Sequence, residues 1–139
     1  MDMKLEVIVL PVSDPDVAKE FYEKAGFHLD VDHQGGESFR VIQFTPPGSA
    51  CSVTFGVGLG PNTSGPIQGL HLVVTDLEAA IAELTDRGIE VSAPFHFGPE
   101  GQTPGVHPER ADYGSYSSFT DPSGNGWLLQ EVGWSGAEG

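Results

Sequence analysis

Few side chains in this sequence could do chemistry, and the histidines are the first candidates. The chain has five histidines and one cysteine. His71 lies in a predicted strand, where a neutral imidazole could donate a hydrogen bond to a ligand or act as a general base. A backbone carbonyl could equally satisfy it. His96 lies between two phenylalanines in a predicted loop that could close over a ligand, although an incidental exposed histidine is the alternative.

Further candidates are Arg40 and three aromatic residues, Tyr113, Tyr116 and Phe55, all at predicted strand positions. Arg40 could bind a ligand carboxylate, or it could pair with one of the many acidic side chains of the surface. Aromatic residues on strands are usually core residues. Some of them must nevertheless face any ligand cavity, which would then suit a planar or largely apolar ligand.

Length and charge limit the classes of partner. The 139 residues fit one domain or two small repeated modules. Acidic residues number 20 and basic residues 6, a net charge of −14, which disfavours nucleic acid and membrane surfaces and favours cationic or neutral small molecules. The single cysteine suits a reducing compartment, and no segment has the pattern of a secretion signal or a membrane span. We therefore expect a cytoplasmic protein.

Two segments of the chain repeat one pattern. Asp14 precedes a predicted helix that ends at Gly26, and Asp76 precedes one that ends at Gly88, so that both separations are 12 residues. Thr75 and Glu78 form a possible capping box for the second helix. The predicted strands are residues 5–12, 27–31, 38–45 and 51–57 in the first copy, and 67–74, 89–91, 113–120 and 127–132 in the second.

The order of these elements predicts an α+β fold of two tandem βαβββ modules, at residues 1–57 and 67–133. A linker at 58–66 joins them, a loop insertion at about 95–112 lengthens the second, and 134–139 form a tail. A helix covers only one face of a four-stranded sheet. The other faces of two such mixed sheets would form a cup that holds a ligand, within one chain or across a dimer.

The repeated module resembles the vicinal oxygen chelate superfamily, which includes glyoxalase I, bleomycin-resistance proteins and extradiol dioxygenases. The resemblance rests on Val12-Ser13-Asp14 and Val74-Thr75-Asp76 at the helix starts and on the turn Asp121-Pro122-Ser123-Gly124-Asn125 before the last strand. It covers residues 4–132. It implies a divalent metal held by His, Gln or Glu on the first and fourth strands of each module, which stabilises an oxyanion of the substrate.

The positions that the resemblance assigns to these metal ligands hold other residues here. They are Val7, Val53, Gly69 and Leu128, none of which can bind a metal. His71 and Gln130 each lie two residues beyond such a position and should share its face of the sheet. A displaced metal site that uses these two residues and a group from the insertion at about 95–112 is therefore the alternative to a protein without a cofactor.

The resemblance then implies a protein of the bleomycin-resistance type, a homodimer that binds a small cationic or aromatic drug or natural product without a metal. A glyoxalase-like lyase or isomerase, with a shifted metal site or an acid–base pair at His71, is the alternative, so whether the protein is an enzyme stays open. The expected ligand contacts are Val7, Arg40, Phe55, Gly69, His71, His96, Tyr113, Tyr116, Leu128 and Gln130.

Overall fold

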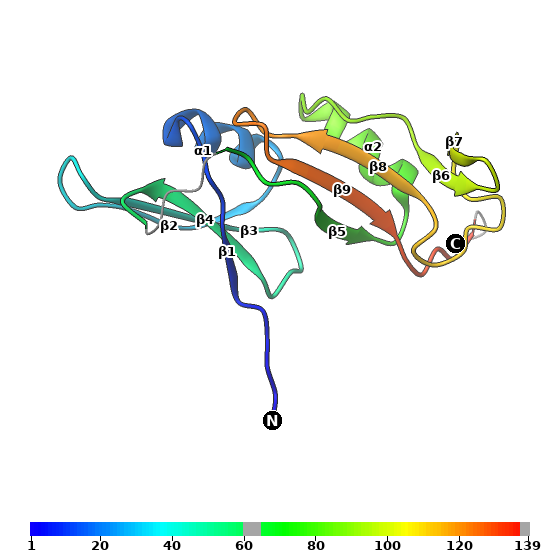
Figure 1. Ribbon diagram of the computed structural model, residues 1–139, viewed down its shortest axis with the longest axis horizontal. Helices are drawn as coiled ribbons and strands as arrows, with labels where there is room; N and C mark the ends of the chain where they lie inside the picture. Colours follow the sequence, from blue (N-terminus) through cyan, green and yellow to red (C-terminus); the bar gives the residue numbers. More distant parts are fainter. Residues whose placement is uncertain (60–64, 137–139) are drawn as a thin grey trace. The chain divides into compact units, whose positions relative to one another are not determined.

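The computed structural model describes residues 1–59 and 65–136 and divides the chain into two compact units (Figure 1). The first unit is Met1–Ile67 together with Asp121–Asn125, and the second is Gln68–Thr120 together with Gly126–Gly139. The predicted linker at 58–66 and the predicted tail at 134–139 lie partly outside the described residues.

The first unit is a four-stranded mixed sheet with one helix. Its strands are β1 (Val7–Val9), β2 (His28–Gln34), β3 (Arg40–Thr45) and β4 (Ser52–Val57), and its helix is α1 (Pro15–Lys24). The strand order is β1-β4-β3-β2, with β1 parallel to β4 and the other pairs antiparallel. Helix α1 covers one face, here called the helix face, and the opposite face is called the open face (Figure 1).

Helix α1 begins and ends where the sequence predicts. The Asp14 carboxylate accepts hydrogen bonds from the backbone N–H groups of Asp16 and Val17, and Gly26 adopts a φ of +94° just beyond the helix. Tyr22, 0% exposed, packs against Phe44 and Phe55 on the helix face of the sheet. This aromatic cluster is the core of the first unit.

The turn Asp121–Asn125 packs into the first unit through a buried polar network. The Tyr22 hydroxyl donates to Asp121 Oδ2 over 2.6 Å, and Asn125 Nδ2 donates to the same oxygen and to the carbonyl oxygen of Pro11. Asp121 Oδ1 accepts from the backbone N–H groups of Ser123 and Asn125. One carboxyl group therefore satisfies four donors in a site where Tyr22 and Asn125 are 0% exposed.

The second unit repeats this arrangement with one more strand. Its strands are β5 (Leu70–Val74), β6 (Phe95–Gly98), β7 (Gly101–Pro104), β8 (Tyr116–Thr120) and β9 (Gly126–Glu131), and its helix is α2 (Leu77–Asp86). The order is β5-β9-β8-β6-β7. Leu77, Phe119, Trp127 and Leu129 fill the space between α2 and the helix face. The Phe119 and Trp127 rings stack 5.9 Å apart, so Trp127 is a packing residue.

Three sequence-based expectations for the second unit are wrong. The insertion at 95–112 is not only loop, because β6 and β7 form a hairpin that joins the sheet where Phe95 pairs with Tyr116. The predicted strand at 89–91 is absent from this described part of the chain, where Ile89 is buried but joins no ladder. Asp76, not Thr75, caps α2, because its side chain accepts from the N–H of Ala79.

A buried ion pair ties the loop after the hairpin to β9 and α2. Arg110 donates to both oxygens of Glu131, over 2.8 and 2.6 Å, and Glu131 is 1% exposed. Glu131 also accepts from the N–H of Leu77, the first residue of α2. Hydrogen bonding from Arg110, then the bond from Leu77, lowers the pKa of Glu131 despite its burial. The Arg110 guanidinium lies 4.1 Å from the ring centre of Trp134.

Candidate functional site

The open face of the second sheet brings together several of the predicted site residues. Leu128 of β9 pairs with His71 of β5, and Gln130 pairs with Val73 on one side and Tyr116 on the other. Because these pairs alternate with the buried residues of the helix face, their side chains share the open face. His71, Leu128, Gln130 and Tyr116 therefore form one surface, as strand parity predicts for His71 and Gln130.

The tautomer of His71 follows from its hydrogen bond. His71 Nδ1 lies 2.7 Å from the carbonyl oxygen of Gly69, which can only accept, so Nδ1 carries the proton in the neutral ring. Gly69, just before β5, has a φ of +86°, a conformation that favours glycine. The exposed imidazole thus offers an unprotonated Nε2, which can accept a hydrogen bond or take up a proton.

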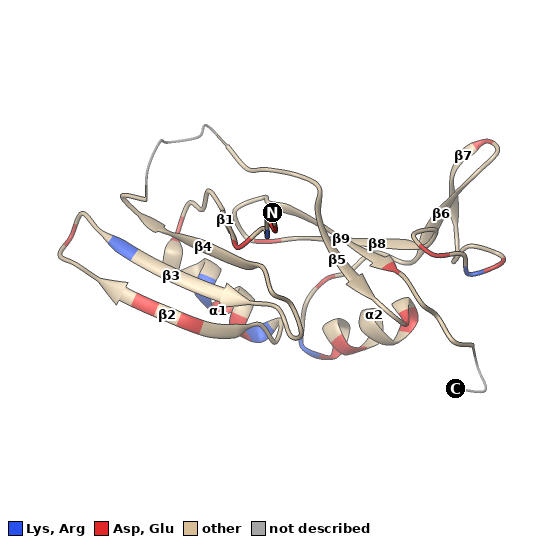
Figure 2. Ribbon diagram, turned by 90° about the horizontal axis from the view of Figure 1, so that it is seen from below, with Lys and Arg blue, Asp and Glu red and all other residues tan. Residues whose placement is uncertain are grey.

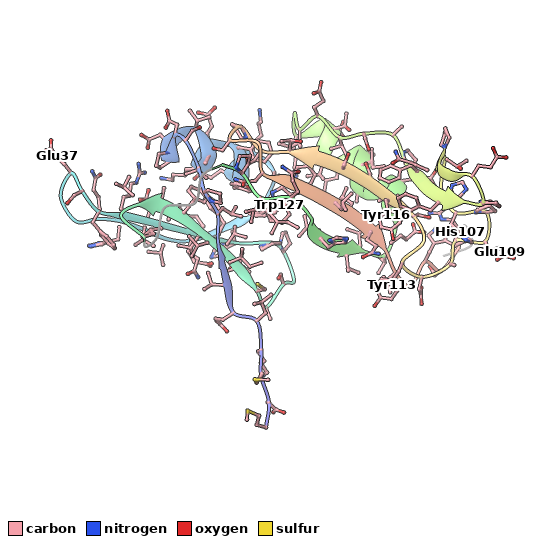
Figure 3. The ribbon with its side chains drawn as sticks, in the orientation of Figure 1. Glu37, His107, Glu109, Tyr113, Tyr116 and Trp127 are labelled. Atoms are coloured by element: carbon pink, nitrogen blue, oxygen red, sulfur yellow. The ribbon has the colours of Figure 1, made fainter. Side chains whose placement is uncertain are left out.

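Gln130 and two tyrosines form the polar part of this surface. Gln130 Nε2 lies 3.3 Å from the hydroxyl oxygen of Tyr116 and 3.4 Å from the carbonyl oxygen of Tyr113. Tyr113 lies outside the predicted strand, because β8 begins only at Tyr116. It adopts a φ of +63°, uncommon for a residue with a side chain, and its side chain is exposed (Figure 3). The backbone bond from Tyr113 N to Glu131 O holds it beside β9.

The hairpin adds aromatic side chains that the sequence reasoning missed. Phe95 stacks on Tyr116 with ring centres 5.7 Å apart, and Phe97, 58% exposed, meets Tyr116 edge to face. The alternation Phe95-His96-Phe97 would have found them if the insertion had been interpreted as a strand. Beside them lies a hollow of about 330 Å³, lined by Ser92, Ala93, Pro94, Phe95, Gln102, Pro104 and Ser118.

His96 is not part of this surface, contrary to the prediction. Strand alternation turns it away from Phe95 and Phe97, toward the opposite side of the hairpin. Its Nδ1 lies 2.8 Å from the carbonyl oxygen of Gly105, and its ring centre lies 6.0 Å from that of His107. The structure therefore does not bring His96 together with His71, Gln130 and Tyr116.

Arg40 and Phe55 lie on the helix face of the first sheet, apart from the open face where the predicted ligand would bind. Phe55 is 0% exposed in the aromatic core. Arg40 donates to Asp16 over 2.6 Å and to both oxygens of Asp32, while Lys19 donates to Asp32 over 2.8 Å. The guanidinium is thus engaged by carboxylates that fasten α1 to β2 and β3.

This ion network makes stability sensitive to acid. Hydrogen bonds from Arg40 and then Lys19 lower the pKa of Asp32 to about 2. A lowered folded-state pKa contributes stability above the unfolded value, and that stability is lost as the pH falls through the folded pKa. We expect Asp32→Asn to remove about 1 kcal/mol of stability at pH 6 and less at pH 3, since this pair is partly solvated. Urea unfolding of the parent and the variant at both pH values measures the difference in their free energies of unfolding. An equal difference at pH 3 and pH 6 would contradict the lowered pKa of Asp32.

The positions that the resemblance assigns to metal ligands are placed as follows. Val7 and Leu128 lie on open faces, and Gly69 lies just before β5. Val53 is buried on the helix face, and its neighbour Thr54 holds the open-face position instead. Among residues 1–59 and 65–136, no three His, Cys, Asp or Glu side chains gather in a way that could hold a metal ion.

Comparison with known proteins gives the family. The model of the Glyoxalase/Bleomycin resistance protein/Dioxygenase superfamily matches residues 4–129. The chain belongs to this superfamily. No curated protein matches it.

Within the described residues, no helix is long and apolar enough to cross a membrane.

Several solved structures resemble the chain over nearly its whole length. TnmS3, an antibiotic binding protein from Streptomyces sp. CB03234, is 31% identical, with 94% of this chain and 97% of that chain covered and a TM-score of 0.70. A glyoxalase/bleomycin resistance protein from the same source is 32% identical (92% and 100% covered, TM-score 0.66). A superfamily member from Sphaerobacter thermophilus DSM 20745 is 27% identical (94% and 98% covered, TM-score 0.68).

Proposed function

We propose that the protein binds a small aromatic or cationic natural product, such as an antibiotic, on the open face of the second sheet. The observation that carries the proposal is the composition of this face. Tyr116, Phe95 and Phe97 offer rings beside a hollow of about 330 Å³, and His71 and Gln130 add polar groups. Small-molecule sites typically combine an apolar wall with a few hydrogen-bonding groups in this way.

Two further observations support a ligand of this kind. TnmS3, a solved structure that shares 31% identity with the chain, is an antibiotic binding protein. The net charge of −14 concentrates cationic molecules near the surface and repels anionic ones. Acidic residues lie on both helices and on β2, among few basic ones (Figure 2).

We propose binding without a metal, because the positions expected to supply metal ligands hold Val7, Val53, Gly69 and Leu128, none of which has a side chain that can bind a metal. Elemental analysis of protein purified without chelators tests this part. Stoichiometric zinc, nickel or manganese would overturn it.

A homodimer in the cytoplasm is the form that we propose for the working protein. Alternate residues of the N-terminal segment, Met3, Leu5, Val7 and Val9, expose apolar side chains that a second copy could bury. Sedimentation velocity measures the oligomeric state, and a monomer at micromolar concentration would contradict the dimer.

The binding proposal is tested by a thermal-shift screen of basic and aromatic natural products. For the tightest compound, we expect Tyr116→Ala and Phe97→Ala to weaken binding by about tenfold or more, because aromatic contacts dominate such sites. Phe39→Ala, which truncates a 38% exposed phenylalanine of the first unit, is the matched control and should not change the affinity. If no compound stabilises the protein, or if Tyr116→Ala binds as tightly as the parent, the proposed site is wrong.

A lyase or isomerase is the second candidate, favoured by the unprotonated Nε2 of His71, which could act as a general base. NMR spectroscopy of each bound compound after incubation distinguishes the two, because it detects an isomer as well as a cleaved product. A change in the structure of the compound that is lost in His71→Ala would indicate an enzyme, whereas an unchanged compound indicates a binding protein.

A further inference from the structure

Two backbone carbonyl groups determine which polar atoms the open face of the second sheet presents. The carbonyl oxygen of Gly69 lies 2.7 Å from Nδ1 of His71. The carbonyl oxygen of Tyr113 lies 3.4 Å from Nε2 of Gln130. Because a carbonyl oxygen can only accept a hydrogen bond, each nitrogen directs a hydrogen toward it. The neutral imidazole of His71 therefore keeps a lone pair at Nε2, and the amide of Gln130 turns its Oε1 away from Tyr113.

Both remaining atoms, His71 Nε2 and Gln130 Oε1, are acceptors that a ligand can reach. His71 is exposed and Gln130 is half-buried. In the part of the chain that the structure describes, no group donates a hydrogen bond to either atom. The hydroxyl of Tyr116 meets the amide nitrogen of Gln130, over 3.3 Å, and leaves Oε1 without a contact. This face therefore offers two acceptors whose orientation is already fixed before a ligand binds.

An apolar side chain lies between these acceptors. Leu128 of β9 pairs with His71 on one side and with Ser118 of β8 on the other. Gln130 follows Leu128 by two residues, so it shares the same face. Neighbouring strands lie about 4.8 Å apart, which separates the backbones of β5 and β8 by about 10 Å. A flat ring system can lie on the half-buried Leu128 within this span, and Ser118 continues the surface into the hollow of about 330 Å³.

The same face carries no charge, although the whole chain has a net charge of −14. Histidine aside, the only charged residue in strands β5 to β9 is Glu131. It is 1% exposed, and its carboxylate is occupied by Arg110. A neutral donor suits this face better than a cation, because no carboxylate is present on it to pair with a positive charge. A phenol combines a neutral O–H donor with an aromatic ring for the apolar surface.

We propose that the open face of the second sheet selects phenols, whose hydroxyl groups donate hydrogen bonds to His71 Nε2 and Gln130 Oε1. This inference rests on the proposed function, because it names the chemical class of that ligand and the two residues that recognise it. An ether with the same ring system has an oxygen that can only accept. It would face the two acceptors without forming a hydrogen bond, at the cost of desolvating them.

The test compares 2-naphthol with 2-methoxynaphthalene, which share one ring system and one oxygen but differ in the hydroxyl hydrogen. Each compound is titrated into the full chain at about pH 8, where an imidazole is ordinarily neutral, and backbone amide shifts locate the binding. We expect both compounds to shift the amides of residues 71–73 and 128–130. We expect 2-naphthol to bind about fivefold more tightly, which is the typical effect of one hydrogen bond.

Variants assign this preference to the two acceptors. The double variant His71→Phe with Gln130→Met retains side chains of similar size, so it should bind 2-methoxynaphthalene like the parent but lose the preference for 2-naphthol. Either substitution alone should reduce the preference. His28→Phe with Gln34→Met makes the same changes in the first unit and should retain the preference.

The outcomes separate this inference from the proposed function. Equal binding of the two compounds to the unaltered chain would overturn the selection of phenols while aromatic binding stands. A preference that persists in His71→Phe with Gln130→Met would overturn the assignment to these acceptors. If neither compound shifts the amides of the second sheet, the proposed function and this inference both fail.

Discussion

Replacing Asp121 with alanine should lower the free energy of unfolding by about 3–5 kcal/mol, because it leaves several buried donors without an acceptor. The Asp121 carboxyl group accepts from the Tyr22 hydroxyl, from Asn125 Nδ2 and from the N–H groups of Ser123 and Asn125. Water cannot easily take the place of the lost carboxyl oxygens, because Asp121 is 4% exposed. Urea denaturation followed by circular dichroism measures the change.

Graded variants separate the contributions to this network. Tyr22→Phe removes one of the four donors to Asp121 and leaves the carboxyl group in place for the other three, so we expect a loss of only about 1 kcal/mol. Asp86→Ala removes a carboxylate at the exposed end of α2 and should leave stability nearly unchanged. If Asp121→Ala costs no more than Tyr22→Phe, the carboxyl group does not organise the turn.

Replacing Glu131 with glutamine should cost about 3–5 kcal/mol, because removing one partner of a buried ion pair leaves the other charge without compensation. The Arg110 side chain is 11% exposed and would keep at most one of its two bonds to residue 131, while Glu78 at 3.3 Å would be its remaining ion-pair partner. The N–H of Leu77 at the start of α2 would meet an amide in place of a carboxylate. Both losses fall in the second unit.

The double variant Glu131→Leu with Arg110→Met is the control for this ion pair. It removes both charges and retains apolar volume, so it should recover part of the stability that Glu131→Gln loses. Arg110→Met alone should also shift the emission of Trp134, whose ring the guanidinium covers at 4.1 Å. A Glu131→Gln protein as stable as the parent at pH 7 would show that the pair contributes little.

The architecture and its helix ends follow from the sequence by itself. Asp14 and Gly26 bound α1 because a carboxylate satisfies free N–H groups at a helix start and glycine accepts a positive φ at its end. The repeat of this pattern at Asp76 and Gly88 predicted two modules of related topology. Strand parity predicted that His71 and Gln130 share a face, since side chains alternate along a strand.

Only the tertiary structure decided the rest of the candidate site. Arg40, Phe55 and His96 were plausible ligand contacts as residue types, but which face of a sheet each occupies depends on register and pairing, which composition does not encode. The hairpin of the insertion brought Phe95 and Phe97 beside Tyr116 by pairing at a sheet edge. A β-bulge between Leu29 and Val31 of β2 put Asp32 on the helix face beside Arg40, because one extra residue reverses every side chain beyond it.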